Sequence, residues 1–135
     1  MTGRHVTYRL RNISLDVGGE GRYPEFWNVN PSHLKTLGCE RGEPIPRWIY
    51  GRVQSIPRDD NSVQNLIVER APLMRVGVRE ILRVIRSGGT LVLPHANIMD
   101  PHEYARSLIS ANVSQRLVLL GNQQVRETIF REVWK

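Results

Sequence analysis

Residues 80–93 read Glu-Ile-Leu-Arg-Val-Ile-Arg-Ser-Gly-Gly-Thr-Leu-Val-Leu, and this stretch decides the fold class. Its first half is basic and has the spacing of an amphipathic helix, which we expect over residues 72–86. Gly88 and Gly89 follow, and glycine tolerates the positive φ that ends many helices. Thr90–Leu93 then forms an apolar run, as in a buried strand. A helix, a glycine turn and a buried strand in succession predict an α/β fold with a parallel sheet.

The expected helix has two distinct faces. Four apolar residues at helical spacing should pack on the sheet, namely Val78, Ile81, Leu82 and Ile85. Four arginines share a separate stripe, namely Arg75, Arg79, Arg83 and Arg86. We interpret this stripe as a solvated helix face, and the alternative is a contact for an anion or an acidic partner.

The rest of the chain alternates apolar runs with turns. The pattern predicts five parallel strands at Ile13–Val17, Phe26–Val29, Trp48–Val53, Asn65–Val68 and Thr90–Leu93. It also predicts a closing antiparallel pair, Arg116–Leu120 and Val125–Trp134, a short helix from Pro31 to Leu37, and a helix from Asp100 to about Asn112. We therefore expect an open, mostly parallel, twisted sheet with the first strand near its centre.

Length and composition limit the class of protein. The chain has 135 residues, of which 40% are hydrophobic and 24% charged, so we expect a single globular domain over residues 1–135. No apolar run approaches the ~18 residues of a membrane span, and the N-terminus has no signal-peptide pattern. Cys39 is the only cysteine, which excludes an internal disulfide. We expect a cytoplasmic protein without a membrane association.

The formal net charge of +6 comes almost wholly from arginine, since Lys35 and Lys135 are the only lysines. The arginines are dispersed among acidic residues, and no basic cluster is interleaved with aromatic residues as in single-strand nucleic-acid sites. Nucleic-acid binding therefore stays an alternative that the sequence does not favour.

The first predicted strand ends in a glycine-rich turn, residues 15–21, Leu-Asp-Val-Gly-Gly-Glu-Gly. Ligands of open parallel sheets bind beyond the carboxyl ends of the strands, where the strand order reverses. Glycines there allow the backbone to approach a ligand, although three glycines after a strand also make an ordinary tight turn. Asp16 is either a carboxylate of that site or a capping residue of the turn.

Four segments, in the same order, resemble class I S-adenosylmethionine-dependent methyltransferases over nearly the whole chain. Residues 24–30 (Pro-Glu-Phe-Trp-Asn-Val-Asn) are similar to the family's Pro-Gly-Trp-Ile-Asn-Val-Asp after the glycine turn. Residues 51–53 (Gly-Arg-Val) stand at the Ala-Asp-Val step, and residues 56–64 (Ile-Pro-Arg-Asp-Asp-Asn-Ser-Val-Gln) resemble Leu-Pro-Phe-Pro-Asp-Asn-Ser-Val-Asp. Residues 83–93 match Arg-Val-Leu-Lys-Pro-Gly-Gly-Arg-Leu-Val-Leu.

The resemblance implies an S-adenosylmethionine (SAM) site. Its residues would be Asp16, Gly18, Gly19, Gly21, Asn30 and Arg52. Three positions depart from the family pattern. The second glycine of the family's turn corresponds to Glu20, or to Gly21 if the alignment slips by one residue. Asn30 stands where the family has the acid that binds the ribose, and Arg52 stands where it has the aspartate that faces adenine. Asparagine lacks the charged, two-oxygen grip, and arginine donates where an acceptor is needed. These departures predict a weakened or lost cofactor site.

Catalytic residues are not identified by any motif. Glu69 and His95 follow strands four and five and would face the crevice as candidate bases. The alternatives are that Glu69 is a surface ion-pair partner of Arg70 or Arg75, and that His95 is a loop residue. The four histidines show no metal-ligand spacing, so we expect no metal site.

The sequence thus predicts a SAM-dependent methyltransferase-like protein whose activity is in doubt. The alternative is a non-catalytic methyltransferase fold that serves as a binding or assembly module. The chain has little sequence where the family carries its substrate-recognition insertions. An acceptor substrate or protein partner therefore stays unidentified, and a second subunit, as in a homo-oligomer, could complete the site.

Overall fold

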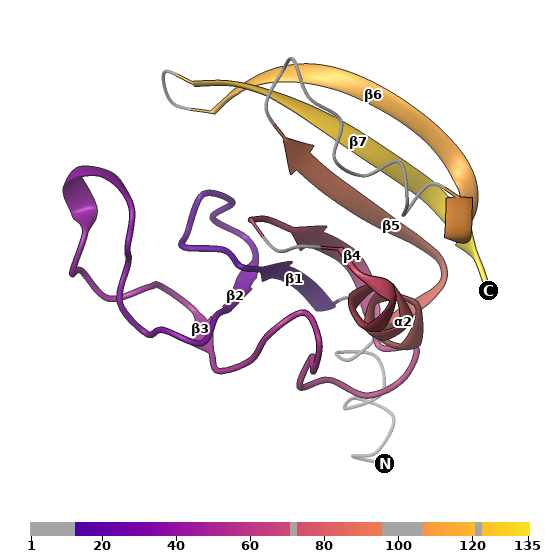
Figure 1. Cartoon of the computed structure of the whole chain (residues 1–135), viewed down its shortest axis with the longest axis horizontal. Helices are drawn as coiled ribbons and strands as arrows, with labels where there is room; N and C mark the ends of the chain where they lie inside the picture. Colours follow the sequence, from indigo (N-terminus) through magenta and orange to yellow (C-terminus); the bar gives the residue numbers. More distant parts are fainter. Residues whose placement is uncertain (1–12, 71–72, 96–106, 121–122) are drawn as a thin grey trace, which may run out of the picture.

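The structure is a computed structural model that describes residues 13–70, 73–95, 107–120 and 123–135. Its strands form one sheet in the order β3-β2-β1-β4-β5-β7-β6 (Figure 1). The strands are β1 (Ile13–Val17), β2 (Trp27–Val29), β3 (Trp48–Ile49), β4 (Val63–Val68), β5 (Ile85–His95), β6 (Ser110–Leu120) and β7 (Gln123–Trp134). The helical elements with given bounds are α2 (Arg75–Val84) and the short 3-10 helix η1 (Gly38–Glu40).

The sheet is parallel from β3 to β5 and closes with two antiparallel pairings, β5 with β7 and β7 with β6. This confirms the predicted open sheet with its terminal hairpin. The order reverses beside β1, which pairs with both β2 and β4, so β1 lies inside the sheet as predicted. Leu15, Leu66, Leu91 and Phe130 are in register across four strands and are fully buried, which fixes one face of the sheet as the apolar core.

Helix α2 packs on that apolar face through Val78, Ile81 and the first residue after the helix, Ile85. The prediction that Leu82 is equally buried is wrong, because Leu82 only packs at the margin of the core. The buried face is turned toward Gly77, where a Cβ atom would lie 3.4 Å from Val53. Gly77 therefore lies against the segment after β3, on the buried side of the helix, and Leu82 lies at the margin of that side.

The predicted role of Gly88 and Gly89 as a helix end is wrong. Helix α2 ends at Val84, and β5 begins at Ile85, so both glycines lie inside the strand. The backbone amides of Asn61 and Ser62 donate to the last helix carbonyls, which removes the need for a glycine cap. The glycines instead form an irregularity in β5, where residues 86–89 stand opposite a single residue of β4.

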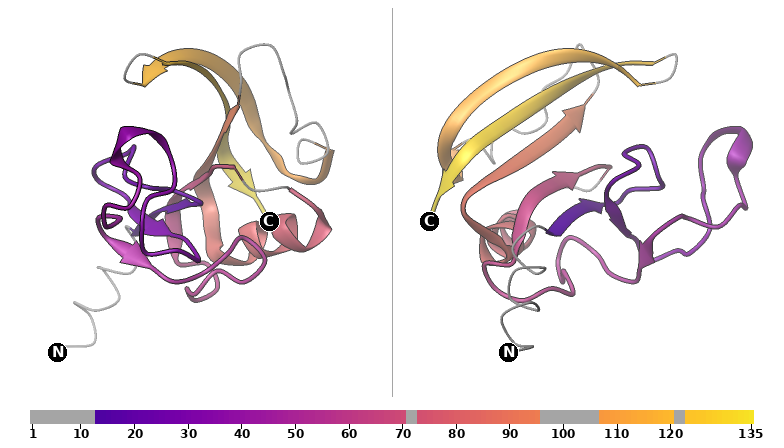
Figure 2. Two further views of the ribbon diagram at one scale, coloured as in Figure 1. Left: turned by 60° about the vertical axis from the view of Figure 1, so that its left-hand side comes forward. Right: turned by 180° about the vertical axis from the view of Figure 1, so that it is seen from behind.

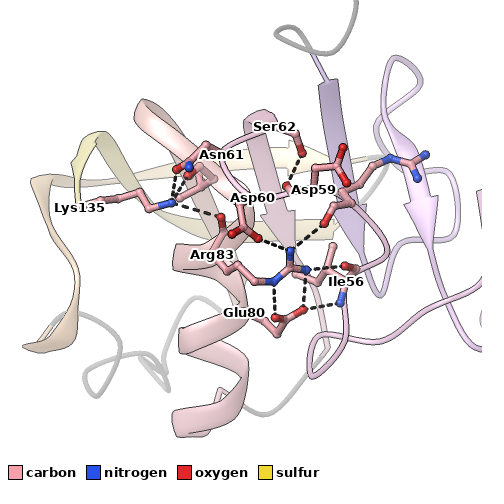
Figure 3. Close-up of polar contacts among 10 residues, drawn as sticks. Ile56, Asp59, Asp60, Asn61, Ser62, Glu80, Arg83 and Lys135 are labelled. Atoms are coloured by element: carbon pink, nitrogen blue, oxygen red, sulfur yellow. Dashed lines mark hydrogen bonds and ion pairs between the residues drawn. The ribbon is translucent and has the colours of Figure 1, made fainter. Parts of the chain in front are cut away.

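The prediction of a solvated arginine stripe fails at Arg83. Its guanidinium binds Glu80 at 2.6 Å and Asp60 at 2.8 Å, and it donates to the carbonyl oxygens of Ile56 and Arg58 (Figure 3). Arg83 therefore fastens α2 to the segment that precedes β4. Arg79, by contrast, is exposed as predicted.

Several predicted boundaries also move. Strand β3 stops at Ile49 rather than Val53, because Arg52 and Ser55 pair with each other and turn the chain out of the sheet. The helix predicted up to Leu37 does not form, since Leu34 bridges to Pro44 instead. Most of the helix predicted from Asp100 lies outside the described residues, and its predicted end is wrong because β6 begins at Ser110.

The β6–β7 hairpin curves along one margin of the sheet, and the loop that carries η1 projects at the opposite margin (Figure 2). No helix in the described ranges has both the length and the apolar character needed to cross a bilayer.

Candidate functional site

A cavity of about 380 Å³ lies at the carboxyl ends of β1, β2 and β4, beside the point where the strand order reverses. Three of the predicted cofactor-site residues line it, namely Gly18, Asn30 and Arg52. Glu20, Glu69 and Arg70 line it as well. The sequence pattern thus locates the cavity, and this volume is within the roughly 300–1,000 Å³ usual for ligand pockets.

Gly18 lets the backbone turn tightly at the end of β1. Its φ is +83°, and a Cβ atom would collide with the carbonyl oxygen of Glu69. The amide of Gly18 donates to Val29 of β2 at 2.7 Å. Backbone therefore forms this wall of the cavity, in the way that a glycine permits.

Asp16, Gly19 and Gly21 do not line the cavity. Asp16 is fully buried beneath the turn, and a Cβ atom on Gly19 would collide with its carboxylate and with the amide oxygen of Asn28. Gly21 lies against Pro46, at 2.9 Å from where a Cβ atom would stand. These three residues therefore support the glycine turn from behind and do not face the cavity.

Asp16 and Glu69 form a buried acidic pair. Neither oxygen of Asp16 and only one oxygen of Glu69 finds a partner among the described residues. Burial raises the pKa of Asp16 well above its usual range, and the neighbouring Glu69 raises it further. A proton held by Asp16 can be donated to Glu69, which satisfies an oxygen that is otherwise unpaired.

Glu69 is paired with Arg70, as the alternative interpretation predicts, but it is not at the surface. Its side chain is 2% exposed and lies 3.4 Å from both Arg22 and Arg70. Arg70 has a left-handed backbone, with φ of +52°, and donates to the carbonyl oxygen of Gly18 at 2.6 Å. This network joins the ends of β1 and β4 at the cavity wall.

The side-chain amide of Asn30 is hydrogen-bonded to the backbone of two neighbouring turns. Its side-chain amide donates to the carbonyl oxygen of Gly19 at 3.2 Å, and its oxygen accepts the amide of Ser32 at 3.0 Å. Asn30 thus ties the turn after β1 to the turn after β2. One acceptor lone pair remains for a ligand, where a carboxylate would offer more.

Arg52 lines the same cavity from the segment after β3 and is exposed. Within the described part of the chain, its guanidinium has no hydrogen-bond or ion-pair partner. Arginine carries only donors, so this wall of the cavity presents donors and a positive charge.

The carboxylate of Glu20 is hydrogen-bonded to Thr36 and is therefore not free to bind a ligand. Both of its oxygens accept the backbone amide of Thr36 at 3.1 Å, and one also accepts the hydroxyl at 2.6 Å. The carboxylate therefore holds the loop before η1 against the glycine turn. Sequence reasoning missed this contact, since nothing in the pattern connects residues 16 positions apart across a loop.

His95 is the last residue of β5 and not a loop residue. It is 8% exposed, and its Nε2 lies 3.0 Å from the hydroxyl of Thr128 on β7. His95 also lines a second cavity of about 550 Å³, which shares Glu69 and Arg70 with the first. The two cavities therefore share part of their lining at the carboxyl end of β4.

Sequence reasoning also missed a third buried carboxylate, Glu127 on β7. It accepts the hydroxyl of Tyr23 at 2.9 Å and the guanidinium of Arg116 at 2.7 Å. Burial and then the hydrogen bond to Glu127 raise the pKa of Tyr23 beyond its usual range. Tyr23 belongs to the connection from β1 to β2, so this contact holds that connection against β7.

The architecture is similar to that of solved methyltransferases. A chain from the complex between the Haloferax volcanii Trm112 methyltransferase activator and a methyltransferase gives a TM-score of 0.65, at 13% identity, over 99% of this chain and 89% of that one. A SAM-dependent methyltransferase from Thermotoga maritima gives 0.62, at 16% identity, over 91% and 82%. A 16S rRNA adenine methyltransferase from Catenulisporales acidiphilia, solved with its cosubstrate SAM, gives 0.54, at 12% identity, over 96% and 91%.

No family model and no curated protein matches the sequence. The similarity therefore lies in the fold, and the strand order with its terminal antiparallel pair is that of a class I SAM-dependent methyltransferase. The chain has a methyltransferase-like fold, as the sequence resemblance predicts.

Proposed function

We propose that this chain is a methyltransferase-fold binding module whose cavity no longer holds SAM well enough for methyl transfer. The proposal rests on the hydrogen bonding of two residues in the cavity, Asn30 and Arg52. Asn30 is engaged with the backbone on both sides of its amide, and Arg52 presents an unpaired guanidinium to the cavity within the described ranges.

These two residues do not fit the groups that SAM would present. The ribose hydroxyls are donors that a carboxylate would accept, and each such charged hydrogen bond contributes roughly 1.5–3 kcal/mol. The adenine amino group is also a donor, so an arginine beside it leaves two donors facing each other without an acceptor. Loss of one charged hydrogen bond corresponds to about a tenfold to hundredfold loss of affinity.

The positions of the acids also speak against a SAM site. The cationic sulfonium and ammonium groups of SAM would favour accessible carboxylates, but Asp16 is buried and Glu20 is bonded to Thr36. The chain as a whole carries +6, which gives no long-range attraction for a cationic ligand.

A partner-dependent methyltransferase is the second candidate. The cavity and the strand order are retained, and the Haloferax volcanii neighbour was solved in complex with a methyltransferase activator. A protein partner could complete the cavity at the site where this chain has no substrate-recognition insertion.

We also propose that residues 1–135 form one domain, because all the described strands belong to one sheet.

Nucleic-acid binding is less well supported. The neighbour from Catenulisporales acidiphilia is an rRNA methyltransferase, but several arginines of this chain are engaged internally. In the described residues the ion-paired arginines include Arg22, Arg70, Arg83 and Arg116. Paired arginines contribute less to counterion release than free ones.

Calorimetric titration of SAM and of S-adenosylhomocysteine into the purified full chain tests the proposal. We expect weak or undetectable heats for both ligands, with circular dichroism confirming that the protein is folded. Tight binding of either ligand would overturn the binding-module proposal and leave the methyltransferase candidate standing.

A further inference from the structure

Strand β6 is an exposed edge of the sheet. It is the last strand in the order and has 11 residues, and among the described strands it pairs only with β7 (Figure 1). Val113, Leu117 and Leu119 are apolar side chains on one of its faces, and their exposed fractions are 42%, 46% and 69%. Long apolar edges are templates for pairing with another strand.

The residues of β6 itself provide little of the usual protection of such an edge. The strand reads Ser-Ala-Asn-Val-Ser-Gln-Arg-Leu-Val-Leu-Leu, without proline and with Arg116 as its single charge. Arg116 is bound to Glu127 of β7 at 2.7 Å, so the strand is close to neutral along its length. Charged side chains and prolines are the common means of preventing edge pairing.

We propose that β6 pairs with β6 of a second copy of this chain, antiparallel, around a two-fold axis at Gln115. In this register Val113 of each copy stands opposite Leu117 of the other, and Leu119 stands opposite Ala111. Cross-strand apolar pairs of this kind stabilise a sheet. The pairing would join two seven-stranded sheets into one continuous sheet.

Charge selects both this register and the partner. Moving the axis by one residue, to Arg116, would place the two Arg116 side chains directly opposite each other, which is unfavourable. With the axis at Gln115, each Arg116 faces Ser114 of the other copy. An acidic peptide would find no free cation on this strand, whereas a copy of the same neutral, apolar edge is complementary to it.

The first test is sedimentation velocity of the full chain over a range of concentrations. We expect a reversible dimer in the wild type, and monomers for the single substitutions Val113→Glu and Leu117→Lys. The double variant with both changes should dimerise again, because the new carboxylate at position 113 of each copy then faces the new ammonium group at position 117 of the other. The control Val76→Glu, at an exposed position on α2, should dimerise as the wild type does.

Ionic strength distinguishes a second copy from other partners. Each chain carries +6, so added salt should strengthen the dimer by screening the repulsion between copies. A wild type that stays monomeric at every concentration, or a dimer unaffected by both single substitutions, would overturn the proposal.

A cross-linking experiment keeps the proposal testable if an edge variant fails to fold. In a Cys39→Ser background, Gln115→Cys places two thiols at the two-fold axis, within the span of a disulfide. Mild oxidation should yield a covalent dimer of Gln115→Cys and little of Asn112→Cys, whose position faces Val118 of the other copy. Equal cross-linking of both variants would contradict the proposed register.

Discussion

Asp16 is fully buried beside Glu69, and neither oxygen of its carboxylate accepts a hydrogen bond from a described residue. An ionised carboxylate in that position would lose its hydration, and the charges of Arg70 and Arg22 offset this cost only in part. Burial and the neighbouring Glu69 raise the pKa of Asp16, so this residue contributes to the pH dependence of the protein's stability.

The pH dependence can be measured with Asp16→Asn. The pKa of Asp16 is higher in the folded than in the unfolded chain, so its protonation stabilises the fold at low pH. This contribution declines as the pH rises from the usual aspartate pKa through the raised one. The substituted amide does not titrate, so the variant should be at least as stable as the wild type at pH 7, and its advantage should shrink at pH 4.

Thermal unfolding followed by circular dichroism at both pH values is the measurement. The opposite result would be a variant that is clearly less stable than the wild type at pH 7, by at least as much as at pH 4. That result would show that ionised Asp16 is favourable in the fold.

At this scale the sequence predicts three of the residues that line the cavity, but not the contacts that these residues make. Gly18, Asn30 and Arg52 are brought together because each follows a strand of the same parallel sheet. The hydrogen bonds of Asn30 to Gly19 and Ser32 depend on turn geometry, which residue types alone do not determine.

At the scale of elements, α2 is held by both its core face and its ion pairs. Ile81 is fully buried, whereas Leu82 packs at the margin. We expect Ile81→Ala to lower the free energy of unfolding by ~2–5 kcal/mol and Leu82→Ala by less. Urea denaturation of both variants measures the difference, and a larger effect at Leu82 would contradict the observed helix face.

The anchoring role of Arg83 gives a matched comparison on the same helix. Arg83→Ala removes bonds to Glu80, Asp60 and two backbone carbonyls, and we expect a loss of about 1–3 kcal/mol, reduced by its partial exposure. Arg79→Ala, at an exposed position, should change stability by less than about 0.5 kcal/mol. Equal effects in the same denaturation experiment would show that the network adds nothing.

The irregularity in β5 predicts that its two glycines differ. A Cβ atom at Gly89 would lie 2.8 Å from Ile85 and 3.0 Å from the carbonyl oxygen of Gln64, so Gly89→Ala requires the backbone to move. Gly88 has open space around it, and only its φ of +85° disfavours alanine, by about 1–2 kcal/mol. Gly89→Ala should therefore lower the melting temperature more than Gly88→Ala. A larger decrease for Gly88→Ala would contradict a steric constraint at Gly89.

The sequence predicts the existence and order of these elements but not their ends. A helix that passes directly into a strand at Ile85 leaves no mark in hydrophobic periodicity, because the same apolar residues serve both elements. The capping groups come from Asn61, Ser62 and Lys135, which are distant in sequence. Two glycines in succession favoured a turn, and only the pairing with β4 shows that they belong to a strand.

At the scale of the whole molecule, a short chain retains the strand order of the methyltransferase fold with few helices in its described parts. The connection from β1 to β2 has no helix, and Tyr23 binds Glu127 instead to hold that connection against the sheet. The overall order could be predicted because four sequence segments resemble one family in sequence. The long-range contact from Tyr23 to Glu127 could not be predicted, because it spans 104 residues without a local signal.

The most direct test of a methyltransferase fold without an effective SAM site is a calorimetric titration of SAM into three proteins. Wild type should bind weakly or not at all. Arg52→Asp should bind about tenfold to a hundredfold more tightly, because it replaces a mismatched donor with a charged acceptor. Arg79→Asp makes the same change in net charge at an exposed position of α2, so it should bind like the wild type.

Adding Asn30→Asp to Arg52→Asp should improve binding further, although the new carboxylate loses the hydrogen bond to the carbonyl oxygen of Gly19. Weak binding by the wild type, together with a gain that occurs at position 52 and not at position 79, is the predicted result. Tight binding by the wild type, or an equal gain from Arg52→Asp and Arg79→Asp, would contradict it.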